Sequence, residues 1–324
     1  MILALNPYFG KNFIEFLFLF IQRIGEFCIG RIGFSEFASD EVQILVLSLV
    51  AIASALIGTF LVLKKMTMLA NSLSHTILLG IVVAYLILLP FMPESQTHLY
   101  TISIEVLLIA SLVTGLITTV LTQMLTYVLK LQEDASTGLV FTTLFALGIV
   151  LVTVYTRNTH LGTEAIMGNV DSLHIHDLKL IFWIALFDFA VIALFFKEFK
   201  MATFDGSFAD VQGFSSSLFN YLLMVLTSAT VIGAFRAVGV LLVLAFLVGP
   251  VITARLFTHR LKKVILLAMG IGAVASLVSV ALARHFLSVH HIPLSTSGMV
   301  ATVLGIFYFL ALAARGLFKN CGRA

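Results

Sequence analysis

Apolar runs long enough to cross a membrane recur along almost the whole chain, and they constrain its fold more than any other feature. A helix needs roughly 20 mostly apolar residues to cross the hydrocarbon core of a bilayer. We count about nine such runs on this criterion. They lie at residues 43–63, 68–89, 102–129, 138–156, 178–198, 217–234, 237–255, 264–284 and 297–316.

The composition agrees with a membrane protein. Hydrophobic residues make up 60% of the 324 positions, and only 11% of the positions are charged. A soluble chain of this length would need far more polar surface. We therefore predict an all-α fold, a polytopic transmembrane helical bundle with about nine spans. The net charge of +3 is spread along loops without a dense basic run, so we expect no nucleic-acid partner.

The N-terminal segment is predicted to lie outside the bundle. Its apolar stretch at residues 13–27 is interrupted by Glu15, Arg23 and Glu26, which favours an interfacial or outer-face helix over a further span. The N-terminus has no basic n-region before its apolar stretch, so we expect no cleavable signal peptide.

Three segments are predicted along the chain. Residues 1–40 form an extracytoplasmic or interfacial segment, residues 41–319 the transmembrane domain and residues 320–324 a cytoplasmic tail. Cys28 and Cys321 lie near opposite ends without the spacing of a metal or disulfide pair, so we interpret them as incidental.

The basic residues predict the orientation, because cytoplasmic loops carry an excess of lysine and arginine. With alternating spans, one set of loops would hold Lys64, Lys65, Lys130, Lys197, Lys200, Arg255, Arg260, Lys262, Lys263, Arg315, Lys319 and Arg323. The opposite loops between spans would hold Arg157, Lys179, Arg236 and Arg284. The richer set is taken as cytoplasmic, which leaves the N-terminus outside and the C-terminus inside.

Most histidines would then lie on the outer side. Two closely spaced pairs are His174 with His176 and His290 with His291. Neutral imidazole binds zinc, iron and manganese, so these pairs could capture a metal ion. They could equally be ordinary interfacial loop residues.

A polar cluster interrupts the second predicted span. Asn71 and His75 lie four residues apart and so share one helix face. At 1.5 Å per residue, His75 lies about 15 Å from Lys65, near the bilayer midplane. Asp188 lies at about the same depth before Lys197. An imidazole, an amide oxygen and a carboxylate at one level could form a divalent-cation site. Asp188 could instead be a structural residue bonded to a serine or threonine.

The longest inward-facing loop is the segment at residues 197–217. Phe204, Phe208, Val211 and Phe214 recur in it near helical spacing, which predicts a short helix lying along the membrane that could dock another protein. The alternative is an ordinary connecting loop, although loops in compact bundles are usually shorter.

Four stretches resemble the permeases of ABC importers for manganese, zinc and iron, and together they span the chain from about residue 43 to its end. Residues 68–80 (MLANSLSHTILLG) resemble the family's G-D-x-L-S-H-x-x-L-P-G signature, and residues 133–148 (EDASTGLVFTTLFALG) its E-D-x-x-x-G segment. MGN followed by Asp177 resembles a G-N-(x)n-D stretch. Residues 203–214 (TFDGSFADVQGF) and 236–256 (RAVGVLLVLAFLVGPVITARL) resemble the family's F-D-x-x-x-A-x-x-x-G loop and V-G-x-L-L-V-x-A-(x)n-P-x-x-x-A-R-L helix.

The resemblance implies a type II-like ABC importer permease in which His75 and Asn71 line the metal path. It also implies that a coupling loop meets the ATPase, and this loop carries Phe204, Asp205, Ala209 and Gly213. Two departures bear on the metal site. Ala70-Asn71 replaces the usual Gly-Asp, and Leu79 replaces the usual proline. Losing the carboxylate should weaken or retune metal binding. Asp188, or a second and different permease subunit, could supply the missing charge.

These features predict a multi-pass protein of the cytoplasmic (inner) membrane that imports a divalent metal ion and holds no permanently bound cofactor. No GxxxxGKS or GxxxxGKT motif occurs, so ATP hydrolysis is expected in a separate subunit. Further expected partners are an extracytoplasmic metal-binding protein and a second permease subunit, in a homodimer or a heterodimer.

Two rivals remain open. A proton-coupled secondary metal transporter would favour more paired intramembrane carboxylates than the one at Asp188. An intramembrane enzyme would pair Ser72 or Ser74 with His75. Ser74 points about 100° away from its neighbour His75 on a helix, and no oxyanion-hole glycine cluster lies near Ser72.

Overall fold

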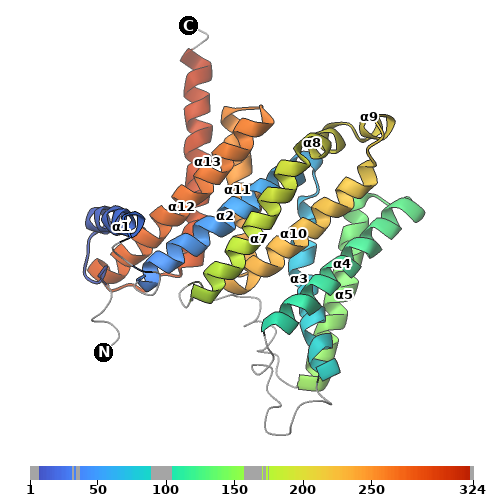
Figure 1. The fold of residues 1–324 in the computed structure, drawn as a ribbon, viewed down its shortest axis with the longest axis horizontal. Helices are drawn as coiled ribbons and strands as arrows, with labels where there is room; N and C mark the ends of the chain where they lie inside the picture. Colours follow the sequence, from blue (N-terminus) through green and yellow to red (C-terminus); the bar gives the residue numbers. More distant parts are fainter. Residues whose placement is uncertain are drawn as a thin grey trace. The chain divides into compact units, whose positions relative to one another are not determined.

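The computed structural model describes residues 7–30, 33, 37–88, 104–156, 170, 173 and 175–321. Within these ranges every element of regular secondary structure longer than one residue is an α-helix, as the all-α prediction requires. The helices are α1 (Phe13–Cys28), α2 (Ser39–Lys64), α3 (Thr67–Leu88), α4 (Ile104–Val128), α5 (Glu133–Thr156), α7 (Ile175–Leu194), α8 (Phe196–Phe204), α9 (Gly206–Val211), α10 (Ser216–Val238), α11 (Val240–Phe257), α12 (Leu261–His290) and α13 (Thr296–Cys321) (Figure 1).

Each predicted span coincides with an apolar helix of the described chain. Six helices, α2, α3, α5, α10, α12 and α13, are long and apolar enough to cross a membrane. A seventh candidate is the pair α7 and α8, which is bent by 75° at Phe195. The apolar parts of α4 and α11 are shorter, at Leu112–Thr126 and Leu241–Phe257. The protein is thus a multi-pass helical membrane protein, and six or seven of its described helices reach full spanning length.

The chain divides into two compact units. The first comprises Met1–Thr59, Asn169–Leu186 and Ala237–Ala324, and the second comprises Phe60–Gly168 and Phe187–Arg236. The discontinuous boundaries show that neither unit is one unbroken stretch of sequence.

In the first unit, α11, α12 and α13 pack against one another, and small residues bring α2 close to the core. Ala51, Ser54 and Ala55 are fully buried, or nearly so. A side chain at Gly58 would collide with the backbone carbonyl of Leu247, and one at Gly272 would lie 2.9 Å from the Cβ of Ala51. These small residues therefore allow close helix packing.

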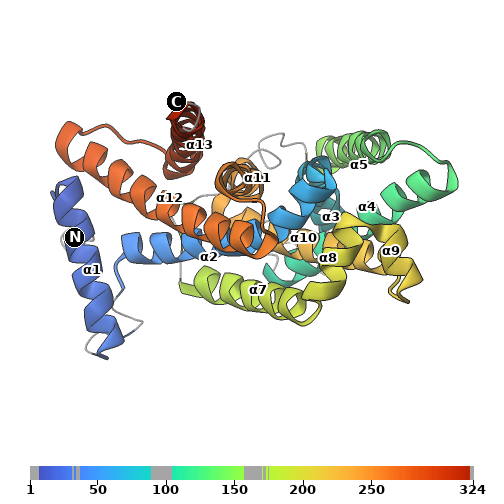
Figure 2. The same cartoon turned by 90° about the horizontal axis from the view of Figure 1, so that it is seen from above.

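Helix α1 is held to the first unit by a buried polar cluster. It lies against α12 (Figure 2), and its Phe16 and Phe20 side chains are buried. The buried Glu41, at the start of α2, accepts a hydrogen bond of 2.6 Å from the Tyr8 hydroxyl and pairs with the Arg23 guanidinium. The predicted helix at residues 13–27 therefore exists and is fixed at one end of a candidate span.

In the second unit, α3 packs against both α4 and α5. Leu78 and Val82 of α3 form an apolar cluster with Val152 of α5, and Phe145 packs against it. The same unit contains α8, α9 and nearly all of α10. The residues around His75 and the segment at residues 197–217 therefore belong to the same compact unit.

Candidate functional site

His75 lies in the middle of α3, on the side that faces α5. Its ring centroid lies 5.4 Å from the ring of Phe141 and 5.4 Å from the ring of Phe145. Its Nδ1 atom is buried and has no hydrogen-bond partner. The imidazole thus contacts two aromatic rings, and its unbonded Nδ1 could bind a metal ion.

Asn71, one turn before His75, is half-buried on the same helix. Between the two, Ser72 is buried, and its hydroxyl has no hydrogen-bond partner. Because neither the Ser72 hydroxyl nor His75 Nδ1 is bonded, the two atoms do not form the nucleophile–base contact that an intramembrane serine enzyme would need. The side chain of Ser74 lies outside the described part of the structure.

Asp188 on α7 is completely buried. Its Oδ2 accepts a hydrogen bond of 2.6 Å from the hydroxyl of Thr230 on α10, whereas its Oδ1 is buried without a partner. The threonine contact is the one expected if Asp188 were structural. The second oxygen remains open to another ligand.

The predicted ligands do not form a complete metal cage in this structure. No group of three His, Cys, Asp or Glu residues that could hold a metal ion occurs among the described side chains. His290 and His291 end α12 with exposed side chains, and the His290 ring centroid lies 5.9 Å from that of His285. His174 and the side chain of His176 lie outside the described residues.

The segment at residues 197–217 contains two short helices, α8 and α9. Phe199 and Ala209 are buried. Phe204, Phe208 and Val211 are exposed, with Val211 at 86%. The segment is therefore helical, in two short helices rather than the one predicted, and it exposes three large apolar side chains.

Three of the four predicted coupling residues stabilise the local fold of this segment. Asp205 caps α9, because its carboxylate accepts a hydrogen bond of 2.9 Å from the backbone N–H of Phe208. Ala209 packs inside, and Gly213 adopts a φ of +87°, which favours glycine. Phe204, by contrast, points its apolar side chain outward.

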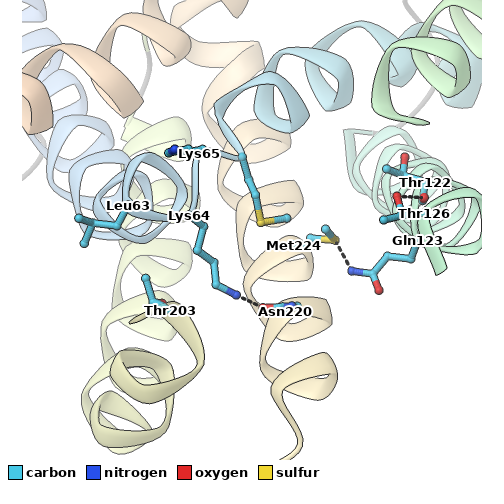
Figure 3. A pocket seen from close by; sticks show the side chains of 10 residues that line it. Leu63, Lys64, Lys65, Thr122, Gln123, Thr126, Thr203, Asn220 and Met224 are labelled. Atoms are coloured by element: carbon cyan, nitrogen blue, oxygen red, sulfur yellow. Dashed lines mark hydrogen bonds between the residues drawn. The ribbon is translucent and has the colours of Figure 1, made fainter. Parts of the chain in front are cut away.

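A polar cavity of about 350 Å³ opens in the second unit, at the end where α2 gives way to α3 (Figure 3). The Lys64 ammonium bonds the amide oxygen of Asn220 there, and the Gln123 amide nitrogen donates to Met224 Sδ at 3.3 Å. Residue types alone did not mark these four positions. The threonine spacing before Gln123, at Thr118 and Thr122, was the one signal present in the sequence.

The comparisons with known proteins extend over nearly all of the chain. A probable metal transport system membrane protein of Chlamydia muridarum is 40% identical over 313 residues, covering 97% of this chain and 96% of that protein. The manganese transport system membrane protein MntD of Bacillus subtilis is 35% identical, covering 84% of this chain and 92% of that protein.

A solved structure has the same fold. The structure described as PsaBC from Streptococcus pneumoniae in complex with Fab aligns with a TM-score of 0.68 and 23% identity, covering 89% of this chain and 95% of that chain. The profile of the ABC 3 transport family matches residues 41–315, the whole predicted transmembrane domain apart from its last residues. The chain therefore belongs to the ABC 3 transport family.

Proposed function

We propose that this protein is the permease subunit of an ATP-driven ABC importer that moves a divalent transition metal ion, manganese, zinc or iron, across the cytoplasmic membrane. The observation that carries the proposal is the near full-length similarity to proteins named for metal and manganese transport. His75 supports it from the chemistry of the chain, since an imidazole with an unbonded nitrogen inside a span suits a metal path.

The metal path would use Asn71 and His75 on α3 and the free oxygen of Asp188. The amide oxygen and the imidazole nitrogen are neutral ligands, so the carboxylate would supply the negative charge. Thr230 would hold that carboxylate in position through its hydrogen bond. A dimer with a second permease subunit, identical or different, could add further ligands.

Coupling to ATP would occur at α8 and α9, within residues 197–217. Asp205, Ala209 and Gly213 would shape this segment, while Phe204, Phe208 and Val211 would enter a groove on the ATP-binding subunit. The excess of lysine and arginine in this set of loops supports its cytoplasmic placement. ATP hydrolysis would take place in the separate subunit, because this chain has no P-loop motif.

Cargo would arrive from an extracytoplasmic metal-binding protein at the opposite face. The exposed His290 and His291 would receive the ion there, together with His174 and His176. The metal is the transported substrate, and we propose no permanently bound cofactor.

The test is metal uptake into proteoliposomes that contain this chain with its candidate ATPase and binding protein. Manganese, zinc and ferrous iron would be compared for the wild type, His75→Ala and Asp188→Asn, with exposed His259→Ala as the matched control. We expect ATP-dependent uptake of one metal that His75→Ala and Asp188→Asn reduce and His259→Ala preserves. Uptake of no metal by the wild type would overturn the proposed function, and full uptake by His75→Ala would overturn the assigned path.

A further inference from the structure

The buried face of α4 has an unusual composition. All of its buried residues with described side chains are polar, apart from one glycine. They are Thr114, Gly115, Thr118, Thr119, Thr122 and Gln123. The large apolar residues of the helix, such as Leu116, Val120 and Met124, are exposed. Helix α4 thus turns its polar side into the second unit, as expected for a helix that lines a polar path through a membrane protein.

Some of the buried hydroxyls of α4 form hydrogen bonds within their own helix. Thr114 and Thr118 donate hydrogen bonds of 2.9 and 2.8 Å to carbonyls one turn earlier in the helix. In the next turn the pattern stops. The hydroxyls of Thr119 and Thr122 and the amide oxygen of Gln123 are buried and have no hydrogen-bond partner.

Three adjacent unbonded oxygens are costly in a dry interior. Each unsatisfied buried polar group destabilises the folded state, because it has lost its hydrogen bonds to water. Most buried polar groups in folded proteins are bonded to protein atoms or to water, so a cluster of exceptions indicates water or an ion. Helix packing alone would be served equally well by alanine or valine at these positions.

The unbonded oxygens are continuous with the His75 region at one end. The hydroxyl oxygen of Thr118 lies 3.1 Å from the hydroxyl oxygen of Thr76, the residue after His75. At the other end, Thr122 and Gln123 line the cavity of about 350 Å³. A polar track therefore runs along α4 from the candidate metal site to this cavity.

The groups that line the cavity would bind a divalent cation only weakly. Asn220 and Gln123 carry amide oxygens, Met224 carries a thioether sulfur, and Thr126 carries a further hydroxyl. These groups are neutral and bind divalent metals weakly compared with carboxylates. The Lys64 ammonium next to them adds a positive charge that opposes retention of a cation (Figure 3).

We propose that the threonine face of α4, from Thr118 to Gln123, and the adjoining cavity form the exit path along which a hydrated divalent metal ion passes from His75 to the cytoplasm. The inference rests on the proposed function for the identity of the ion. The oxygens of Thr119, Thr122 and Gln123 replace part of the hydration shell of the ion, and Lys64 promotes its release.

Thiol accessibility tests the path independently of transport. In a background with Cys28→Ser and Cys321→Ser, Thr122→Cys would be compared with Val120→Cys on the opposite, exposed apolar face of the same helix. A positively charged methanethiosulfonate reagent would be applied from the Lys64 side of inside-out vesicles that hold the full complex. Only a thiolate reacts, so a thiol in lipid stays inert, and we expect Thr122→Cys to react at least about tenfold faster.

Metal protection and transport complete the test. Manganese, zinc or ferrous ions, supplied with ATP, should slow labelling at Thr122→Cys. Thr122→Val keeps the shape without the hydroxyl, and it should lower the maximal uptake rate about tenfold, the effect of one lost contact to a charged group. The control Thr142→Val, on the exposed surface of α5, should transport normally.

The outcomes separate the two proposals. If the wild type imports metal but Thr122→Cys is unreactive with and without ATP, the exit path is wrong and the function stands. If Thr122→Cys is reactive but no metal protects it and the wild type imports none, the proposed function is wrong, and with it the assignment of the path to a metal ion. Normal uptake by Thr122→Val would also overturn the path.

Discussion

Asn71 stands where the resembling signature carries an aspartate, and this one residue changes the charge of the candidate metal site. We predict that Asn71→Asp strengthens metal binding, because a carboxylate oxygen binds a divalent cation more strongly than an amide oxygen does. A charge-assisted contact is worth about 1.5–3 kcal/mol, so the half-saturating metal concentration for uptake should fall about tenfold or more.

The control for this change is Gln22→Glu, which adds the same charge at an exposed position of α1. It should leave the half-saturating concentration at the midplane site unchanged. An Asn71→Asp variant with wild-type metal affinity would show that Asn71 is not a ligand.

Some residues of the site could be predicted from the sequence, and others could not. His75 was identifiable because an imidazole is rare in an apolar run. The roles of Thr119 and Thr122 were not, since threonine is common in spans and usually bonds a carbonyl in its own helix. Only the three-dimensional structure distinguishes Thr118, which makes that bond, from Thr122, which does not.

At the scale of the element, the exposed face of α8 and α9 carries the second prediction. Phe208 is half-exposed, so Phe208→Asp should cost little stability but replace an exposed apolar side chain of the proposed docking surface with a charge. We expect the ATPase to dissociate during purification and ATP-dependent uptake to fall at least about tenfold, the loss of one central anchor. Co-purification and uptake would be measured together.

The matched control is Ser207→Asp, which adds the same charge at the neighbouring exposed position. It should retain more of the ATPase than Phe208→Asp does. Stable co-purification of the ATPase with Phe208→Asp would move the docking surface away from α9.

The polar attachment of α1 predicts a dependence on pH. Burial, together with the hydrogen bond to Glu41, raises the pKa of the Tyr8 hydroxyl above its ordinary range. A raised pKa means that the contribution of Tyr8 is complete below its unfolded pKa of about 10 and is lost as the pH rises above it. Helix α1 should therefore loosen only at strongly alkaline pH, by about 1 kcal/mol for the lost bond.

A nitroxide on Glu15→Cys, in the background without the native cysteines, would report this loosening as increased mobility by electron paramagnetic resonance. Tyr8→Phe should be more mobile already at pH 7 and show no further alkaline step. An equal alkaline step in both proteins would show that Tyr8 is not the group that titrates.

Elements were easier to predict than their geometry. The apolar runs gave each span its helix, because length and hydropathy suffice for that. The 75° bend at Phe195 could not be predicted, because no proline or glycine lies there. A second helix begins directly after it. The place of α1 could not be predicted either, since the ion pair of its Arg23 with Glu41 joins residues on two different helices.

At the scale of the whole molecule, the two units come from interleaved parts of the chain, so no segment forms one of them alone. His75, helix α4 and helices α8 and α9 all belong to the second unit. A movement transmitted by an ATPase at α8 and α9 would thus reach the proposed exit path within one compact body.

The energy source is the property that most clearly separates the proposed importer from a secondary carrier. A proton-coupled carrier needs intramembrane groups that gain and lose protons during transport, and Asp188 is the one carboxylate predicted near the midplane. We therefore predict that uptake by the reconstituted complex requires hydrolysable ATP and proceeds at an unchanged rate when an ionophore collapses the proton gradient. A non-hydrolysable ATP analogue is the control for nucleotide binding alone. Uptake that continues without ATP and stops with the gradient would replace the importer with the carrier, and it would make Asp188 the proton-binding residue.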